Sequence, residues 1–347
     1  MFAEAVLKHR PSDFIVREAM ALPVQDEPGP AHRYLVLRKC GYTTTEAIGW
    51  IAAKLGLRTA DITFGGLKDE DGVTEQLIAL PATALSDEDT GCVLSLTEAD
   101  DRRLSLWHHG YGADPIAIGE LEGNAFRVVV RDLGGSPAER FSALRKVNLL
   151  FLNYYDTQRF GVPGGPKRSH LVGEAMLAGD WSLALRELAG LGAPESDAAG
   201  AWTGQAKRFF DSLDPRAASF FLAAHSSHEW NTALAARAGE VFGDAALDVE
   251  IDTIPYRYAR CGAAAAELLG NCREIPFVKR SLHNGLITAK TSTRASVVQT
   301  VVSVSGFGPD TEFPGRFQAT LGFFLPSGCY ATAAVRQLVS YIVHGAP

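Results

Sequence analysis

The order of its predicted elements constrains the fold of this chain more than any other feature, because strand-like segments near both ends of the sequence flank a long helical segment. Alternation of apolar and polar residues predicts strands on both sides of that middle, over 13–18, 33–38, 62–66, 77–80, 104–108, 124–131, 296–305 and 317–325. From about Gly161 the sequence is rich in alanine and in helical patterns, and its longest predicted helix begins at Asp214-Pro215 and runs to about Arg237. A helical insertion within a mixed α+β domain explains this order better than two consecutive domains do. We therefore predict a discontinuous mixed-sheet domain, residues 1–160 and 305–347, interrupted by a largely helical insertion, residues 161–304.

Three further helices are predicted from their start and stop signals. Thr43 and Glu46 form a capping box ahead of an apolar stripe that Gly56 ends. A second capping box, 136–139, predicts a helix that carries Phe141, Leu144, Val147 and Phe151. The last helix is predicted near 331–343.

Composition limits the class of protein. The chain has 347 residues, 46% of them hydrophobic, and it has no apolar run of the roughly 18 residues that a membrane-spanning helix needs. The start of the chain lacks the pattern of a secretory signal, and five scattered cysteines make no disulfide framework. A cytoplasmic protein with no membrane association is therefore expected. A net charge of −7 does not by itself favour nucleic-acid binding, but local basic patches can still bind phosphates.

Residues 63–76 are a candidate site, because a strand leads through paired glycines into Lys68-Asp69 and on to Thr74 and Gln76. Glycines allow a backbone to approach a ligand closely, and an aspartate beside a lysine can be held ionised as a nucleophile or base. The alternative is a hairpin loop with solvated charges.

Other segments combine aromatic rings with polar donors. Residues 153–161 carry tyrosines beside Gln158 and Arg159, a combination typical of proteins that stack and read unpaired bases. Asn124 and Phe126 repeat this theme on one strand face. The alternatives are an aromatic-anchored turn for the first segment and a core residue for Phe126.

The sequence contains two candidate metal sites, and neither has the ligand pattern that would predict metal binding. His225 and His228 share a helix face, but no pattern places a third ligand near them. A third hypothesis is a metal-dependent hydrolase that uses Asp69, Glu70 and Asp71, but neighbouring carboxylates alternate faces and do not easily converge on one ion.

Five segments, in this order, resemble the TruD-type tRNA pseudouridine synthases. They are the opening Lys8, Asp13, Phe14, Val16 and Glu18; Gly66, Lys68, Asp69, Val73, Thr74 and Gln76; Gly123, Asn124 and Phe126; Asn153, Tyr154, Gln158, Arg159, Phe160 and Gly161; and the closing Leu325, Pro326, Gly328, Tyr330, Ala331 and Thr332. Each motif is weak alone, but five in the right order are unlikely to arise by chance.

The resemblance implies a mixed-sheet catalytic domain with a helical insertion, and an isomerase that converts uridine to pseudouridine in tRNA, usually at position 13 of the D arm. It implies that Asp69 is the nucleophile, that Lys8 keeps this carboxylate ionised, and that Phe126 stacks on the flipped uracil. Phe14, Asn124 and Tyr330 would line the nucleoside pocket. The remaining motif residues are candidate RNA contacts, namely Lys68, Gln76, Gln158 and Arg159. No cofactor, metal or protein partner is implied; tRNA is the expected partner.

The sequence departs from the family pattern near the predicted nucleophile. Glu70 and Asp71 follow Asp69 where basic or neutral residues are commoner, Gly72 replaces the usual alanine, and Tyr155-Asp156 stands for Phe-Gly. Extra carboxylates repel phosphate and raise the pKa of a neighbouring carboxyl. The alternative hypothesis is therefore a tRNA-binding protein or RNA chaperone on the same scaffold, without turnover.

Overall fold

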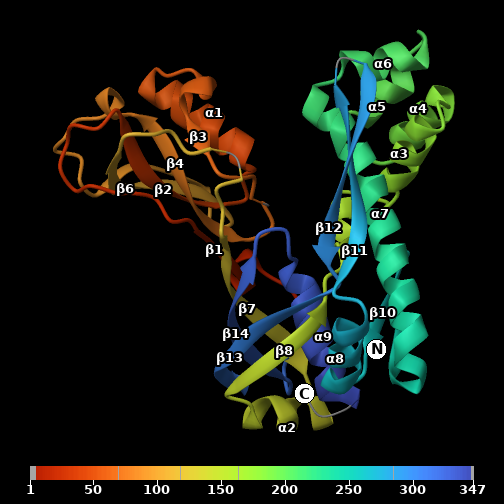
Figure 1. The fold of residues 1–347 in the computed structure, drawn as a ribbon. Helices are drawn as coiled ribbons and strands as arrows, with labels where there is room; N and C mark the ends of the chain where they lie inside the picture. The colour runs from red at the N-terminus through yellow and green to blue at the C-terminus, as the bar shows by residue number, and fades with distance from the viewer. Residues whose placement is uncertain (1–4, 69, 118, 163, 284, 345–347) are drawn as a thin grey trace. The chain divides into compact units, whose positions relative to one another are not determined.

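The computed structural model describes residues 5–344 apart from 69, 118, 163 and 284, and its contacts divide the chain into two units (Figure 1). The sheet unit comprises Phe2–Asn148 and Thr300–Gly328, and the helical unit comprises Leu149–Gln299 and Cys329–Pro347. The divisions at 148/149 and 299/300 lie near the domain boundaries predicted at 160/161 and 304/305. The division at 328/329 has no predicted counterpart, and it groups Tyr330 and the last helix with the helical unit rather than with the mixed-sheet domain. The assignment of catalysis to one domain stays a prediction. The α+β class with a large mixed sheet and a helical segment is confirmed.

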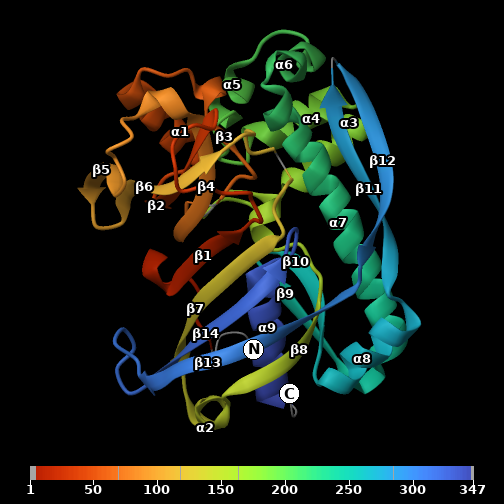
Figure 2. The same ribbon diagram turned by 60° about the vertical axis from the view of Figure 1, so that its left-hand side comes forward.

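The sheet unit is built on a mixed sheet with the strand order β5-β6-β2-β4-β1-β7-β14-β13-β8, in which β3 also pairs with β4. Its strands are β1 (Phe14–Ala19), β2 (His32–Cys40), β3 (Thr63–Phe64), β4 (Val73–Pro81), β5 (Cys92–Ala99), β6 (Arg102–Gly112), β7 (Gly123–Leu133), β8 (Lys146–Leu152), β13 (Val297–Pro309) and β14 (Phe317–Pro326). Strand β1 runs parallel to β4 and antiparallel to β7. Figure 2 shows β1, β7, β14 and β13 following one another across the sheet. Strands β8 and β13 both continue into the helical unit.

Helix α1 (Thr44–Leu55) covers one face of β2, β4 and β6. The predicted capping box is confirmed, because the Thr43 side chain accepts from Glu46 N and the Glu46 carboxylate accepts from Thr43 N. Gly56 ends the helix with φ 66°, the left-handed conformation that glycine adopts without strain. The face of α1 towards the sheet is apolar and buries Ile48 and Ile51 against Leu37, Ile78 and Leu106 of the strands.

The helix predicted from the second capping box is wrong in its start and its end. Helix α2 (Gly135–Ala143) begins after Gly134, whose position carries no side-chain cap, and it ends before Leu144. Val147 and Phe151, which the prediction placed in this helix, lie in strand β8, because their alternation with Leu149 also fits a strand and sheet pairing decides between the two patterns.

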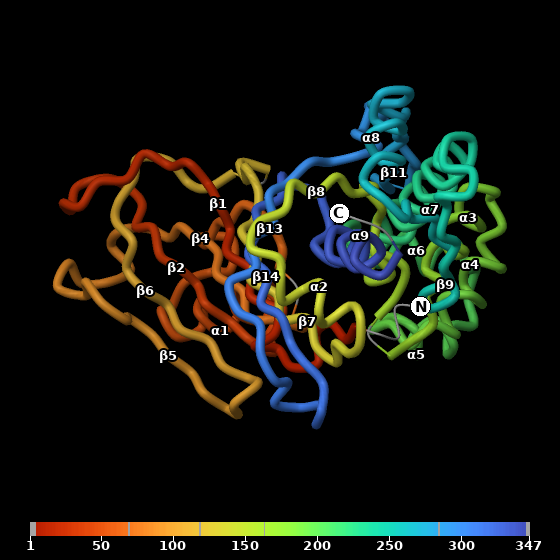
Figure 3. The backbone as a smooth tube through the Cα atoms, turned by 90° about the horizontal axis from the view of Figure 1, so that it is seen from below, coloured from red at the N-terminus to blue at the C-terminus, as the bar shows by residue number. Residues whose placement is uncertain are grey.

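The helical unit is a bundle around the long helix α7, with two small two-stranded sheets. Its helices are α3 (Ser169–Leu177), α4 (Trp181–Ala189), α5 (Ser196–Ala201), α6 (Ala206–Ser212), α7 (Pro215–Phe242), α8 (Gly262–Asn271) and α9 (Ala331–His344), and its strands are β9 (Ala246–Ile251), β10 (Ile254–Ala259), β11 (Glu274–His283) and β12 (Leu286–Ala295). Helix α3 packs against α7 and α4 (Figure 3). The β11–β12 hairpin, which the sequence patterns did not predict, lies along α7 (Figures 1 and 2).

Within the described residues, no helix combines the length and the apolar content that crossing a bilayer would require.

Candidate functional site

The residues predicted to form the nucleoside pocket gather on one face of neighbouring strands of the sheet unit. Phe14, Val16 and Glu18 of β1 lie directly opposite Val128, Phe126 and Asn124 of β7. Directly opposed residues of an antiparallel pair point to the same side of a sheet. The structure therefore brings Phe14, Asn124 and Phe126 together, although two of them are more than one hundred positions from the first in the sequence.

Three phenylalanine rings form the apolar part of this face. The Phe126 ring stacks on Phe323 of β14 at a centroid distance of 5.4 Å and an interplanar angle of 23°, and Phe14 meets it edge-on at 5.9 Å. Phe126 is 9% exposed, so most of its surface already contacts protein. Phe323 was missed as a site residue, yet the alternation of its strand places it on the same face as Leu321 and Leu325.

Lys8, the cation predicted to act beside Asp69, lies against this ring cluster. Its Nζ is 4.5 Å from the centroid of the Phe14 ring, a cation–π contact. Its backbone is left-handed, with φ 55°, which costs free energy for a lysine and is typical of functional positions. Asp69, the predicted nucleophile, lies outside the described residues.

A buried ion-pair network fixes the start of β1. Both Asp13 carboxylate oxygens accept hydrogen bonds of 2.7 Å from the Arg131 guanidinium, which also donates to Asp310 over 2.9 Å. The hydrogen bond that Arg131 donates to Asp13 is the largest cause that raises the pKa of Arg131. Burial alone would raise the pKa of Asp310, but backbone N–H donors and Arg131 hold it below its usual range. Because Asp13 precedes Phe14, the network positions the first ring of the pocket.

The backbone on both sides of position 69 is tied to the elements that flank it. Lys68 N donates to Thr44 Oγ1 over 2.9 Å, and the buried Lys39 Nζ donates to Lys68 O over 3.1 Å. After position 69, Gly41 N donates to Glu70 O over 3.2 Å. These bonds tie the loop to the end of β2 and to the first turn of α1.

Gln76, a predicted RNA contact, uses its amide within the protein. Its Nε2 donates to Gly66 O over 3.0 Å, and its Oε1 accepts from Thr44 Oγ1 over 3.0 Å. The Gln76 side chain is 1% exposed, and its bond to Gly66 O fixes the part of the loop that precedes Lys68. A direct contact between Gln76 and RNA stays a prediction.

Lys68, another predicted RNA contact, pairs with a buried carboxylate. Its Nζ is 2.9 Å from Glu18 Oε1, and the two side chains are 8% and 0% exposed. The second oxygen, Glu18 Oε2, accepts from Leu77 N over 3.2 Å. The Lys68 ammonium thus links the loop to β1, and its contact with RNA stays a prediction.

Asn124, opposite Glu18, has an unsatisfied buried acceptor. Its Oδ1 has no hydrogen-bond partner in the part of the chain that the structure describes. A buried polar oxygen without a donor costs free energy, so native structures keep few of them. Such an atom is suited to accept a hydrogen bond from a ligand.

Gly72 is required where the loop meets Phe14. A Cβ at this position would lie 2.5 Å from Phe14 O, closer than real side-chain atoms come to backbone. The absence of a side chain at Gly72 therefore makes room for the Phe14 backbone.

Tyr330, Gln158 and Arg159 belong to the helical unit. The Tyr330 ring meets Tyr155 edge-on at 5.7 Å. Gln158 is half-buried, while Arg159 Nε donates to Ser227 Oγ over 3.3 Å. Their motif has a structural role as well, since the buried Asp156 forms an ion pair with Arg336 of α9.

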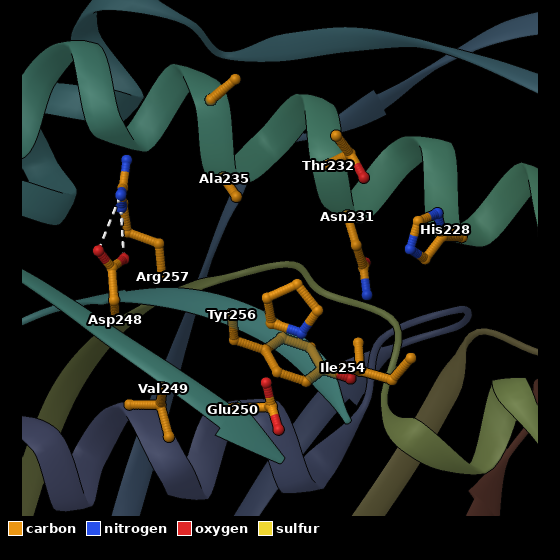
Figure 4. Close-up of a pocket in the computed structure, with 12 residues that line it drawn as sticks. His228, Asn231, Thr232, Ala235, Asp248, Val249, Glu250, Ile254, Tyr256 and Arg257 are labelled. Carbon is orange, nitrogen blue, oxygen red and sulfur yellow. Dashed lines mark hydrogen bonds and ion pairs between the residues drawn. The ribbon is translucent and has the colours of Figure 1, made fainter. Parts of the chain in front are cut away.

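The helical unit also contains a cavity of about 460 Å³ between α7 and the β9–β10 hairpin (Figure 4). His228, Asn231 and Thr232 of α7 line one side, and Asp248 and Arg257 form an ion pair at one end. None of the predicted site residues lines this cavity. In the described ranges, no group of three or more His, Cys, Asp or Glu side chains is arranged to hold a metal ion.

Comparisons with known proteins agree with the motif order. Residues 3–229 match the family model for tRNA pseudouridine synthase D (TruD). The chain is 35% identical over 188 residues to a tRNA pseudouridine synthase D from Geobacter sulfurreducens, covering 53% of this chain and 43% of the relative, so that match spans less than half of the relative's length. The chain is 28% identical over 355 residues to a tRNA pseudouridine synthase D from Stutzerimonas stutzeri, covering 97% of this chain and 93% of the relative.

A crystal structure of a TruD-type protein from Methanosarcina mazei has a similar fold. The TM-score is 0.59 with 19% identity, and the superposition covers 98% of this chain and 93% of the other. At that identity, the likeness concerns the fold alone.

Proposed function

Since the chain belongs to the TruD family of tRNA pseudouridine synthases, we propose that it isomerises uridine to pseudouridine in tRNA, at position 13 of the D arm. The observation that carries the proposal is the clustering of Lys8, Phe14, Asn124 and Phe126, since these motif residues come from distant parts of the sequence and meet on one sheet face. The tethered loop that contains position 69 supports it further.

The proposed reaction begins with attack of the Asp69 carboxylate on C1′ of a uridine that has been turned out of the RNA helix. The N1–C1′ bond breaks, and the uracil leaves as an anion. The base then rotates, C5 forms a bond to C1′, and the carboxylate is displaced. The proton on C5 passes to solvent while N1 gains one, so that atoms and charge balance without an oxidant or reductant.

Lys8 and Asn124 have separate roles in this proposal. The Lys8 ammonium lies at the edge of the ring cluster, where a cation lowers the pKa of a nearby carboxyl and favours its ionised form. Asn124 Oδ1, unsatisfied in the described part of the chain, would accept the N3–H of uracil. Phe126 and Phe14 would supply the apolar wall against which a flipped base packs.

The experiment is release of tritium from tRNA that contains 5-³H-uridine, since formation of the C1′–C5 bond expels the hydrogen at C5. Wild-type protein should release tritium, and Asp69→Asn should abolish release while folding and tRNA binding remain. Glu70→Gln, which removes the adjacent carboxylate, is the matched control and should retain activity.

Binding of tRNA without tritium release by the wild-type chain would instead support the non-catalytic alternative. Substantial activity in Asp69→Asn would show that the nucleophile is assigned wrongly.

A further inference from the structure

The β11–β12 hairpin of the helical unit has an unusual charge composition. Apart from Glu274 at its first position, the hairpin contains no aspartate or glutamate, and residues 275–295 contain four lysines and arginines, in a chain whose net charge is −7. A local concentration of positive charge creates a positive potential that attracts anions, even on a protein with a negative net charge.

The two faces of this hairpin have different environments. On the face towards α7, Arg280 forms an ion pair with Glu229, and the Leu282 side chain joins the helical core. The backbone Leu282 N donates to Ser219 Oγ of α7 over 3.0 Å. Residues that alternate with these point to the opposite side of the two-stranded sheet. That opposite side is the outward face of the hairpin.

The outward face carries two lysines directly opposite each other. Lys279 of β11 pairs in register with Lys290 of β12, and both are exposed. Neither has an ion-pair partner within 4 Å among the residues that the structure describes. Like charges directly opposite across two strands are destabilising. An anion placed between the two ammonium groups would remove the repulsion.

Hydroxyl and aromatic groups extend the same face in both directions from the lysines. The next pair towards the hairpin tip is Ser281 and Thr288, whose hydroxyl oxygens are 3.0 Å apart. Towards the base, the same side of the hairpin turns towards α7, because Phe277 stacks on Tyr155 at 5.9 Å and meets the buried Trp230 of α7 edge-on at 6.2 Å. These groups combine hydrogen-bond donors with rings, as surfaces that hold RNA strands do.

The base of this face reaches a residue of the predicted nucleoside pocket. The Arg294 guanidinium lies 4.2 Å from the centroid of the Tyr155 ring and donates to Tyr155 Oη over 3.3 Å. Tyr330 meets the same tyrosine edge-on. A chain of ring contacts through Phe277 and Tyr155 therefore joins the strand of Lys279 to Tyr330 within the helical unit.

We propose that the outward face of the β11–β12 hairpin binds the phosphate backbone of the substrate tRNA, with Lys279 and Lys290 as the paired phosphate contacts. The inference rests on the proposed function for the identity of the RNA. It adds a binding surface that the resemblance to the family did not predict, since none of the five motifs includes these lysines.

The test is the salt dependence of binding between the full chain and an unmodified, fluorescently labelled tRNA transcript. Each phosphate contact contributes about 0.7 to the slope of log K against log salt concentration for a single strand, so Lys279→Gln with Lys290→Gln should lower the slope by about 1.4. If the wild type and the double variant have equal affinity for tRNA at about 1 M salt, the lower slope means that the double variant binds tRNA roughly 25-fold more weakly at about 0.1 M salt. The control, Lys54→Gln with Lys146→Gln, removes two exposed lysines of the sheet unit and should bind as wild type does.

A second variant separates binding from folding. Lys279→Glu places opposite charges across the strands, so its unfolding temperature should equal or exceed that of the wild type while its tRNA binding weakens. A Gln double variant with the wild-type slope and Kd would overturn the proposal, as would a Lys279→Glu variant that binds normally; an acidic protein segment would then be the better candidate for this face. If those variants bind normally and tritium is still released, only the hairpin proposal fails. If the wild-type chain binds no tRNA, both proposals fail.

Discussion

The ion pair between Glu18 and Lys68 gives a prediction whose size follows from burial. Replacing Lys68 with methionine leaves the Glu18 carboxylate, which is 0% exposed, with Leu77 N as its remaining described donor. Removing one partner of a buried ion pair costs about 3–5 kcal/mol, because the other charge stays buried and uncompensated. We therefore expect Lys68→Met to lower the free energy of unfolding by about 3 kcal/mol or more.

A double-mutant cycle tests this reasoning. Glu18→Gln with Lys68→Met removes both charges, so the double variant should lose less stability than the sum of the single variants, with a coupling energy of at least about 1 kcal/mol. Urea unfolding at constant m-value measures each term. Lys207→Met is the control, since the Lys207–Asp211 pair is exposed and such pairs contribute under about 1 kcal/mol. A Lys68→Met variant as stable as this control, with additive effects in the cycle, would refute the argument.

Three further predictions concern single positions. Gly72→Ala should lower stability by roughly 1–3 kcal/mol, because its Cβ would press on Phe14 O, whereas Gly66→Ala, with open space around its Cβ position, should cost far less; urea unfolding compares the two. Burial, with the neighbouring His228, lowers the pKa of His170 to about 4. As pH falls, the imidazole is therefore protonated in the unfolded chain before it is protonated in the folded chain, and the free energy of unfolding should fall between about pH 6.5 and pH 4. An unchanged pH dependence of stability in His170→Phe would contradict this. Phe126→Ala should cost about 3–5 kcal/mol of stability in addition to slowing tritium release, and a variant of wild-type stability would contradict the packing described for this ring.

Local signals were enough to predict several elements. The capping residues Thr43 and Glu46 and the terminating Gly56 act within a few positions of each other, and helix α1 begins and ends where they indicate. The strand that carries Asn124 and Phe126 was predicted for the same reason, since its alternation is regular over many residues. By contrast, Val147 fitted both a helical and a strand pattern, and pairing with a distant segment decided between them.

Contacts between distant segments could not be predicted from the sequence. The alternation of its strand predicts that Arg131 points outward, yet it is buried and forms ion pairs with Asp13 and Asp310. These two residues lie more than one hundred positions before and after it in the sequence. The pairing of Lys68 with Glu18 depends in the same way on β1 lying parallel to β4. Both ion pairs are the result of tertiary packing, for which a single sequence carries no local signal.

The hairpin lysines were missed for a related reason. Lys279 and Lys290 are eleven positions apart and belong to no motif, so their significance depends on the strand register that places them opposite each other. The absence of acidic residues from 275–295 was visible in the sequence and is the signal that could have identified this segment.

The central claim is that this chain converts a uridine of tRNA into pseudouridine. Purified protein incubated with an unmodified tRNA transcript, followed by mapping of pseudouridine at single-nucleotide resolution, tests it most directly. We predict one new pseudouridine, at position 13, that is absent when Asp69→Asn replaces the wild type. A transcript that stays free of pseudouridine at every position, although the protein is folded and bound to it, would contradict the claim.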